Sequence, residues 1–208
     1  MGGLTGPRPL QEDDDRLSFN CGRPSLDTWF HRHSWRNQVL GSSRTNVICE
    51  SRTGAIAGFV SLSASQIERS ALPKSGQRNQ PDPIPAILLG QLAVDQQWQG
   101  KGLSTSLLHF AFRTTLSAAD SVGCHCLITH PLDDGVRAFY RRFGFEDLPF
   151  DPRRAMAVRL VDLRRSGFCR QCPPPPTPDW GFLIARTQTT REPKSIVSST
   201  KMSMKDMM

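Results

Sequence analysis

Between residues 91 and 108 the chain reads QLAVDQQWQGKGLSTSLL, a stretch that predicts a strand, a turn with two glycines and the start of a helix. Residues 87–94 form an apolar run of strand length, and a helical pattern begins at Leu103. Glycine at positions 100 and 102 permits a tight turn with no side chain to block a ligand. The amides of such a turn lack intrahelical partners and carry the positive end of the helix dipole. We therefore expect the turn to bind an anion such as a pyrophosphate.

The spacing of the two glycines narrows the choice of ligand. A Rossmann fingerprint needs a third glycine where Thr105 stands, and a P-loop needs a glycine where Asp95 stands. The pattern that remains is Gln97-x-x-Gly100-x-Gly102. It resembles the Q/R-x-x-G-x-G/A coenzyme A signature of the GNAT N-acetyltransferases. The alternative reading is an ordinary turn between a strand and a helix that happens to contain two glycines.

Composition limits the remaining classes of protein. The chain has 208 residues, of which 38% are hydrophobic and 22% charged, and this suits one globular core with a tail. A formal charge of +7 favours a polyanion such as coenzyme A or RNA, or an acidic partner. No apolar run approaches the ~20 residues of a membrane span, and the N-terminus lacks the apolar core of a signal peptide. We therefore expect a cytoplasmic protein whose six cysteines are free thiols.

The periodicity of the chain predicts alternating helices and strands. Residues 1–16 read as a flexible lead-in, 17–165 as the folded domain and 166–208 as a disordered tail rich in Pro, Ser, Thr, Lys and Met. The predicted elements are a helix over 24–38 capped by Ser25, strands over 47–49 and 55–62, a loop over 63–85, a strand over 87–94, a helix over 103–122 closed by Gly123, a strand over 124–129, a helix from Asp133 or Asp134 to about 143, and a final strand over 155–163.

Several phrases between residues 19 and 163 resemble the GNAT toxins of bacterial toxin–antitoxin modules. They are 19–29 (FNCGRPSLDTW), 37–38 (NQ), 41–45 (GSSRT), 83–85 (PIP), 89–95 (LGQLAVD), 99–103 (QGKGL) and 139–145 (FYRRFGF). The resemblance implies the α/β GNAT fold, a mixed and mostly antiparallel sheet flanked by helices and splayed at its central strand. It also implies acetyl-CoA as co-substrate and acetylation of the amino group of aminoacyl-tRNA, which blocks translation. A ribbon-helix-helix antitoxin and a homodimer are implied as partners.

Three positions depart from that group. Gln91 stands where the group commonly has arginine, Ser104 where it commonly has a third glycine, and His130-Pro131 where a smaller residue is usual. The first departure bears on binding of the acyl acceptor. The second adds a hydroxyl donor to the expected pyrophosphate site.

The resemblance also assigns roles along the turn and the strand before it. It places the thioester carbonyl at the amides of Leu92, Ala93 and Val94. The pyrophosphate falls at the amides of Gln99, Gly100, Lys101, Gly102, Leu103, Ser104 and Thr105, with Lys101 as a charge partner. Tyr140, the chain's one tyrosine, stands where the family keeps the acid that protonates the leaving sulfur. A phenol of pKa about 10 is protonated at neutral pH and can serve. The alternative is an aromatic ring that only packs beside Phe139 and Phe143.

The sequence offers no evident carboxylate base, and this bears on the substrate. An α-amine, with a pKa of about 7.7–8.0, is partly neutral without a base, whereas a lysine amine near 10.4 is not. An aminoacyl ester therefore suits the chain, and Arg44, Lys74, Arg78 and Arg36 are candidate contacts for RNA phosphates. A protein N-terminus or a small amine is a second candidate acceptor, and an inactive binding protein is a third possibility. Cys124-His125-Cys126 and Cys169-x-x-Cys172 lack matching ligand pairs, so we expect no metal.

Overall fold

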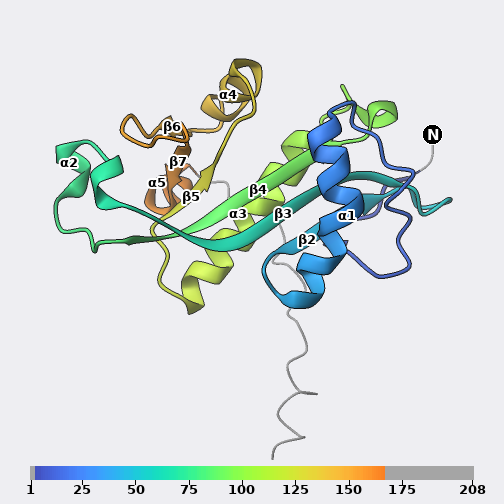
Figure 1. Ribbon diagram of the computed structural model, residues 1–208, viewed down its shortest axis with the longest axis horizontal. Coiled ribbons are helices and arrows are strands. Elements are labelled where there is room, and N and C mark those ends of the chain that lie inside the picture. Colours follow the sequence, from blue (N-terminus) through green and yellow to red (C-terminus); the bar gives the residue numbers. More distant parts are fainter. Residues whose placement is uncertain (1–2, 167–208) are drawn as a thin grey trace, which may run out of the picture. The chain divides into compact units, whose positions relative to one another are not determined.

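A seven-stranded sheet forms the centre of the computed structural model, which describes residues 3–166 (Figure 1). The strand order is β1-β2-β3-β4-β5-β7-β6, and β4 and β5 are the parallel pair among antiparallel neighbours. This is the mixed, mostly antiparallel sheet that the resemblance implies. The strands are β1 (Arg8–Pro9), β2 (Arg44–Cys49), β3 (Ile56–Ile67), β4 (Ile84–Val94), β5 (Cys126–Thr129), β6 (Glu146–Asp147) and β7 (Met156–Arg159).

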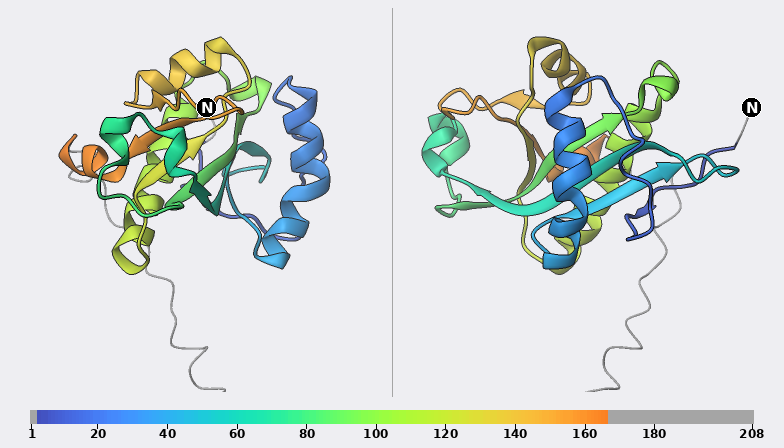
Figure 2. Two further views of the ribbon diagram at one scale, coloured as in Figure 1. Left: turned by 60° about the vertical axis from the view of Figure 1, so that its left-hand side comes forward. Right: turned by 45° about the vertical axis from the view of Figure 1, so that its right-hand side comes forward.

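Helices cover both faces of this sheet, with α1 on one face and α3 on the other (Figure 2). The helices are α1 (Pro24–Leu40), α2 (Lys74–Gln77), α3 (Leu103–Ser121), α4 (Asp134–Arg141) and α5 (Leu160–Arg165), with 3-10 turns η1 (Arg69–Ala71) and η2 (Gln96–Trp98).

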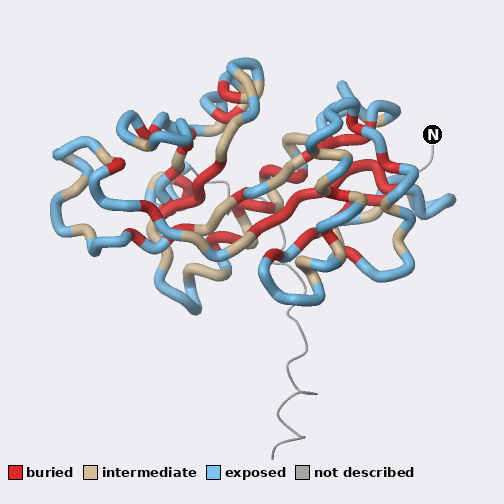
Figure 3. The backbone as a smooth tube through the Cα atoms, viewed as in Figure 1, coloured by how far each residue is buried: buried red, intermediate tan, exposed pale blue. Residues whose placement is uncertain are grey.

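Two clusters of buried apolar residues hold α1 and α3 on the sheet. Figure 3 shows the buried residues running along the central strands. Phe30 of α1 stacks on Phe59 of β3 with ring centroids 4.1 Å apart. On the other face Leu107 and Phe112 of α3 are buried. A Cβ on Gly58 of β3 would come within 3.0 Å of Leu107 Cδ1, so glycine there permits the close approach of α3. Fixing α3 against β3 also fixes the glycine turn at its N-terminus.

The central strand separates from its parallel neighbour halfway along its length. β4 pairs with β5 only over residues 86–89, and the pairing ends at Leu89 and Thr129. Beyond that point β4 runs on to Val94 and stays paired with β3 on its other side. A register shift lies between Ser61 and Leu62 of β3, opposite Gly90. One edge of β4 from Gly90 to Val94 is therefore free of a neighbouring strand, and this confirms the predicted splay.

The structure corrects the expected flexible lead-in. β1 pairs antiparallel with β2, and Leu4 forms an isolated bridge with Glu50. Leu10 is only 2% exposed. The Arg8 guanidinium is paired with Asp14 at 2.5 Å, so part of the acidic run is internally bound rather than solvated. These contacts join residues distant in sequence, which local composition does not reveal.

Several element ends also differ from prediction. Ser25 is not the cap of α1: the helix begins at Pro24, which suits the first helical position, and the N-cap residue is Arg23, with no side-chain hydrogen bond. Helix α3 ends through an extended Val122, so Gly123 is not a left-handed cap. The expected last strand stops at Arg159, and α5 follows it. The expected loop 63–85 contains the end of β3, η1, α2 and the start of β4. The predicted tail lies outside the described residues apart from Ser166.

Residues 3–166 contain no helix long and apolar enough to cross a membrane. Cys21, Cys49, Cys124 and Cys126 are free thiols. Over the same range no cluster of three potential metal-ligating side chains occurs.

Candidate active site

The glycine turn between β4 and α3 presents a row of backbone amides. Gly100 and Gly102 have φ angles of 73° and 80°, a left-handed conformation that favours glycine, and Gly102 is the N-cap residue of α3. The Ser106 amide bonds to the Gly102 carbonyl at 3.1 Å, so the amides before it precede the helical hydrogen-bond ladder. A Cβ at either glycine would meet open space rather than protein. The turn therefore has the free donors and the room that a pyrophosphate requires.

Side chains around this turn hold it in place. The Gln99 side-chain amide donates to the Cys21 and Val94 carbonyls at 3.0 Å each. Asp95 accepts from the Asn20 amide at 2.9 Å and from the Gln97 amide at 3.0 Å. The segment before α1 is thus bonded to the turn, although about 75 residues of chain separate them. The Gln99 side chain therefore stabilises the turn, in addition to the backbone amide that Gln99 adds to the row.

Two hollows open along the free edge of β4. The first, which we call the glycine-turn hollow, has a volume of about 640 Å3. Its walls come from the turn, the end of β4 and α4, and it is lined in part by Ala93, Val94, Trp98, Gln99, Gly100, Gly102, Leu103, Ser104, Phe139 and Arg142. The second, the polar hollow, has a volume of about 540 Å3 and lies along β4 on the α1 side. Both hollows share Arg23, Leu26, Leu92, Val136 and Tyr140. They therefore meet where the free edge of β4 faces α4.

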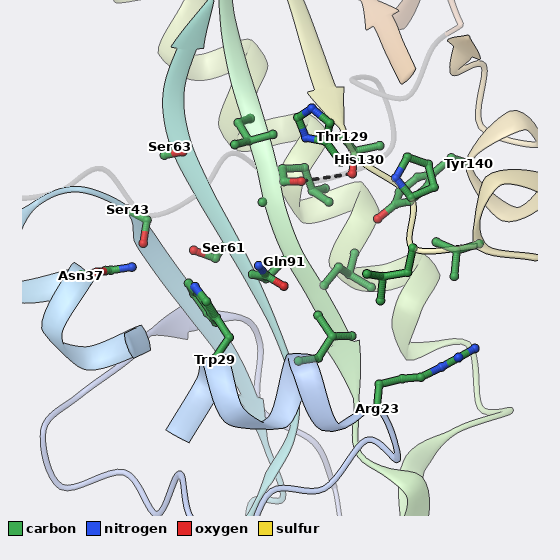
Figure 4. A pocket seen from close by; sticks show the side chains of 18 of the residues that line it. Arg23, Trp29, Asn37, Ser43, Ser61, Ser63, Gln91, Thr129, His130 and Tyr140 are labelled. Atoms are coloured by element: carbon green, nitrogen blue, oxygen red, sulfur yellow. Dashed lines mark hydrogen bonds between the residues drawn. The ribbon is translucent and has the colours of Figure 1, made fainter. Parts of the chain in front are cut away.

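Tyr140 lines both hollows and so lies at that meeting point. Figure 4 shows its side chain in the polar hollow. The residue is 5% exposed, and its ring packs against Phe139 and Phe145. Burial raises the pKa of the phenol to about 12, although a hydrogen bond with Thr129 opposes the rise. Thr129 in turn donates to the Leu89 carbonyl at 3.1 Å. The hydroxyl is therefore protonated at neutral pH and held where the two hollows join.

The polar hollow is lined by neutral hydrogen-bonding groups from several elements and from the turn before β2. Figure 4 shows Asn37 of α1, Ser61 of β3 and Gln91 of β4 converging with Ser43 beside Trp29. Ser43 is 9% exposed, and its Oγ has no hydrogen-bond partner among the described residues. This face of the hollow is prepared to bind a polar group.

Most of the predicted coenzyme A residues line the hollows, and two do not. The lining residues among them are Leu92, Ala93, Val94, Gln99, Gly100, Gly102, Leu103 and Ser104. Lys101 instead donates from Nζ to the Gln97 carbonyl at 2.8 Å and lies 4.5 Å from the Trp98 ring centroid. Thr105 is half-buried one residue further into α3 and lines neither hollow.

The four predicted RNA contacts are not brought together. Arg36 and Arg44 are exposed near the end of α1, where Arg44 donates to the Gln38 carbonyl at 2.9 Å. Lys74 and Arg78 lie around α2, which projects from the other end of the sheet (Figure 1). None of the four lines either hollow.

Two arginines without a predicted role do line the hollows. Arg142 lines the glycine-turn hollow, exposed, with its guanidinium 5.5 Å from the Phe139 ring centroid. Arg23 lies on both hollows and pairs with Asp133 at 2.8 Å, joining the N-termini of α1 and α4. Arg142 was visible as a basic residue two positions after Tyr140. Arg23 was not, because its partner is 110 residues away.

A splayed central strand beside a glycine turn with free amides is the arrangement expected of an acyltransferase that uses a thioester carrier. The Acetyltransferase (GNAT) domain model matches residues 42–147, and the chain belongs to this family. The resemblance stated from the sequence is thereby confirmed.

Relatives of stated activity are similar over most of the chain. A tRNA-acetylating toxin of Mycobacterium tuberculosis is 42% identical over 164 residues, which are 79% of this chain and 97% of the relative. The structure of AtaT complexed with acetyl-methionyl-tRNAfMet is 30% identical with a TM-score of 0.73, covering 79% of this chain and 99% of AtaT. A mutant AtaT toxin bound to acetyl-CoA and the C-terminus of the antitoxin AtaR is 26% identical with a TM-score of 0.67, covering 78% and 97%.

Proposed function

We propose that this chain is a toxin that transfers the acetyl group of acetyl-CoA to the amino group of aminoacyl-tRNA in the cytoplasm and so blocks translation. The observation that carries the proposal is the pair of hollows that meet at Tyr140, one beside a glycine turn and one lined by neutral polar groups. Similarity over most of the chain to a tRNA-acetylating toxin supports the same conclusion.

The glycine-turn hollow suits the carrier. The amides from Gly100 to Thr105 would bind the pyrophosphate, because they lie at a helix N-terminus. Arg142, exposed at the same hollow, adds a cation for the phosphates. The free edge of β4 over Leu92, Ala93 and Val94 offers backbone donors to the pantetheine and to the thioester carbonyl. Acetyl-CoA supplies an activated acyl group whose leaving group is a thiolate.

Tyr140 serves as the acid for that leaving group. Its raised pKa keeps the hydroxyl protonated at neutral pH. As the C–N bond forms and the C–S bond breaks, Tyr140 donates its proton to the departing sulfur, and the proton that the amine nitrogen loses restores the phenol through solvent. The residues lining the polar hollow include no carboxylate, so the attacking amine must arrive neutral. An α-amine next to an ester meets that condition more easily than a lysine amine does.

Exposed cations outside the hollows provide contacts for the RNA. Arg36 and Arg44 lie on the α1 side of the polar hollow, and we assign them the phosphates nearest the acceptor end. Lys74 and Arg78, around α2, would meet phosphates further along the tRNA. We further propose that the protein is a homodimer and that a ribbon-helix-helix antitoxin neutralises it. Light scattering of the protein alone tests the dimer. Light scattering of the protein mixed with the product of the neighbouring reading frame tests the complex with the antitoxin.

The test is acetyl transfer to charged tRNA. Protein with acetyl-CoA and aminoacylated bulk tRNA should yield N-acetyl-aminoacyl-tRNA, detected after nuclease digestion by mass spectrometry. Acetylation of a peptide N-terminus or a free amine, with none on any charged tRNA, would replace the proposed acceptor. A folded protein that binds no acetyl-CoA in calorimetry would contradict the enzymatic proposal altogether.

A further inference from the structure

The polar hollow carries more information than the position of an amine. It is lined by 19 residues that lie between Arg23 and Tyr140 in the sequence. Among these lining residues, Arg23 alone has a side chain that is fully ionised at neutral pH. The Arg23 side chain is 59% exposed, and its guanidinium is already paired with Asp133. No aspartate or glutamate is among the lining residues. The interior of the hollow therefore offers dipoles rather than charges.

The titratable groups in the hollow also remain neutral. His130 lines it, and burial lowers the pKa of the imidazole, with Arg153 lowering it further and Asp151 opposing. Its Nε2 has no hydrogen-bond partner among the described residues. Tyr140 stays protonated for the reason given above.

The hydrogen-bonding capacity of the hollow is concentrated opposite Tyr140. The buried Ser43 Oγ has no partner in residues 3–166. Ser61 is 2% exposed and accepts from Thr45 Oγ1 at 3.2 Å, which leaves its own hydroxyl hydrogen available. Gln91 adds a half-exposed, neutral amide from the bulged part of β4, directly opposite Ser61.

These contacts limit which part of the acceptor can enter. A phosphodiester backbone is bound by cations, and the interior of the hollow supplies none. The aminoacyl side chain is attached to the same carbon as the reacting amine, so it must lie within a few bonds of Tyr140. A charged side chain there would lose its water without gaining an ionic partner, which is costly.

We infer that the polar hollow binds the aminoacyl side chain of the acceptor and selects side chains that carry no charge, with Gln91 as the residue that sets this preference. The inference rests on the proposed function and specifies the acceptor of that same site.

The experiment compares acceptors that differ in charge but not in size. One tRNA is chemically charged with arginine or its neutral isostere citrulline, and with aspartate or its neutral isostere asparagine. The rate of acetyl transfer is measured for each by mass spectrometry. We expect kcat/KM to be at least about tenfold higher for citrulline than for arginine, and for asparagine than for aspartate.

Variants at Gln91 give the inference a second test. Gln91→Glu keeps the shape and adds a negative charge, so the arginine-to-citrulline ratio of kcat/KM should rise by about tenfold. Gln91→Arg should raise the aspartate-to-asparagine ratio instead. The matched control is Gln66→Glu, the same change at an exposed position of β3 that lines neither hollow. The control should leave both ratios unchanged.

The outcomes separate the two claims. Transfer to all four acceptors at similar rates, or Gln91 variants that alter every acceptor equally, would overturn the inference and leave the proposed function intact. Acetylation of none of them or of any naturally charged tRNA would overturn the proposed function, and the inference with it.

Discussion

The Tyr140→Phe substitution removes one oxygen from the point where the two hollows meet. The phenylalanine ring keeps the contacts with Phe139 and Phe145, and Thr129 keeps its bond to the Leu89 carbonyl. The loss of one partly satisfied buried hydrogen bond costs about 1 kcal/mol of folding stability. Loss of a positioned general acid lowers kcat by about 10²- to 10⁴-fold, or about 3 to 5 kcal/mol in the barrier.

The assay follows N-acetyl-aminoacyl-tRNA formation under single-turnover conditions, with acetyl-CoA affinity from calorimetry and stability from thermal unfolding. We expect the rate to fall at least about 100-fold, while affinity and unfolding change little. A Tyr140→Phe enzyme that retains a rate within a few-fold of wild type would refute the acid role. It would leave Tyr140 as a packing residue.

The raised pKa of Tyr140 allows a direct spectroscopic check. Tyr140 is the one tyrosine in the chain, so ultraviolet absorbance of the tyrosinate form reports it alone. Because burial disfavours the charged form, ionisation should have its midpoint at about 12 rather than near 10. As the pH rises, the tyrosine of the unfolded chain ionises first. The contribution of Tyr140 to the free energy of unfolding is therefore fully present below pH about 10 and decreases above it. A midpoint near 10 in the folded protein would contradict the buried position.

Three further substitutions test other parts of the account. Gly102→Ala places a Cβ on a residue with φ of 80°, which adds strain of about 1 to 2 kcal/mol to the turn. Acetyl-CoA binding measured by calorimetry should weaken. Unchanged affinity would contradict the assignment of the pyrophosphate to this turn. Arg142→Ala should raise the KM for acetyl-CoA several-fold and reduce the salt dependence of that KM, while kcat stays unchanged. A loss in kcat alone would contradict a contact between Arg142 and the phosphates. Phe30→Ala removes a fully buried ring that stacks on Phe59. The free energy of unfolding from urea titration should fall by about 3 to 5 kcal/mol. A change below about 1 kcal/mol would show that this contact does not hold α1 on the sheet.

Features encoded in contiguous sequence were predictable. The apolar run before Gly100, the two glycines and the helical pattern after Leu103 determine the turn by themselves, and the structure places them as expected. The Asp133 cap of α4 is equally local, since its side chain accepts from the Val136 amide three residues on. Tyr140 was identified from its flanking phrase, which local spacing preserves.

Features that depend on sheet register were not predictable. The polar hollow combines a face of α1 and the turn at Ser42 and Ser43 with positions of β3 and β4, and only the strand pairing brings Ser61 opposite Gln91. Leu26, Trp29 and Asn37 of α1 all line the polar hollow, but nothing local in the sequence indicated what they would meet. The same applies to β1, whose partner on β2 is nearly 40 residues away. The basic residues were chosen by charge alone, and the fold disperses them because charge does not specify position.

The central claim is that the main-chain amides of the glycine turn bind the pyrophosphate of acetyl-CoA. An amide NMR titration of isotopically labelled protein with acetyl-CoA measures this directly. We expect saturable chemical-shift changes concentrated at Gly100, Gly102 and the first turn of α3, with smaller ones along Leu92 to Val94. Saturable binding that leaves the turn amides unmoved, or no binding by a folded protein, would contradict it.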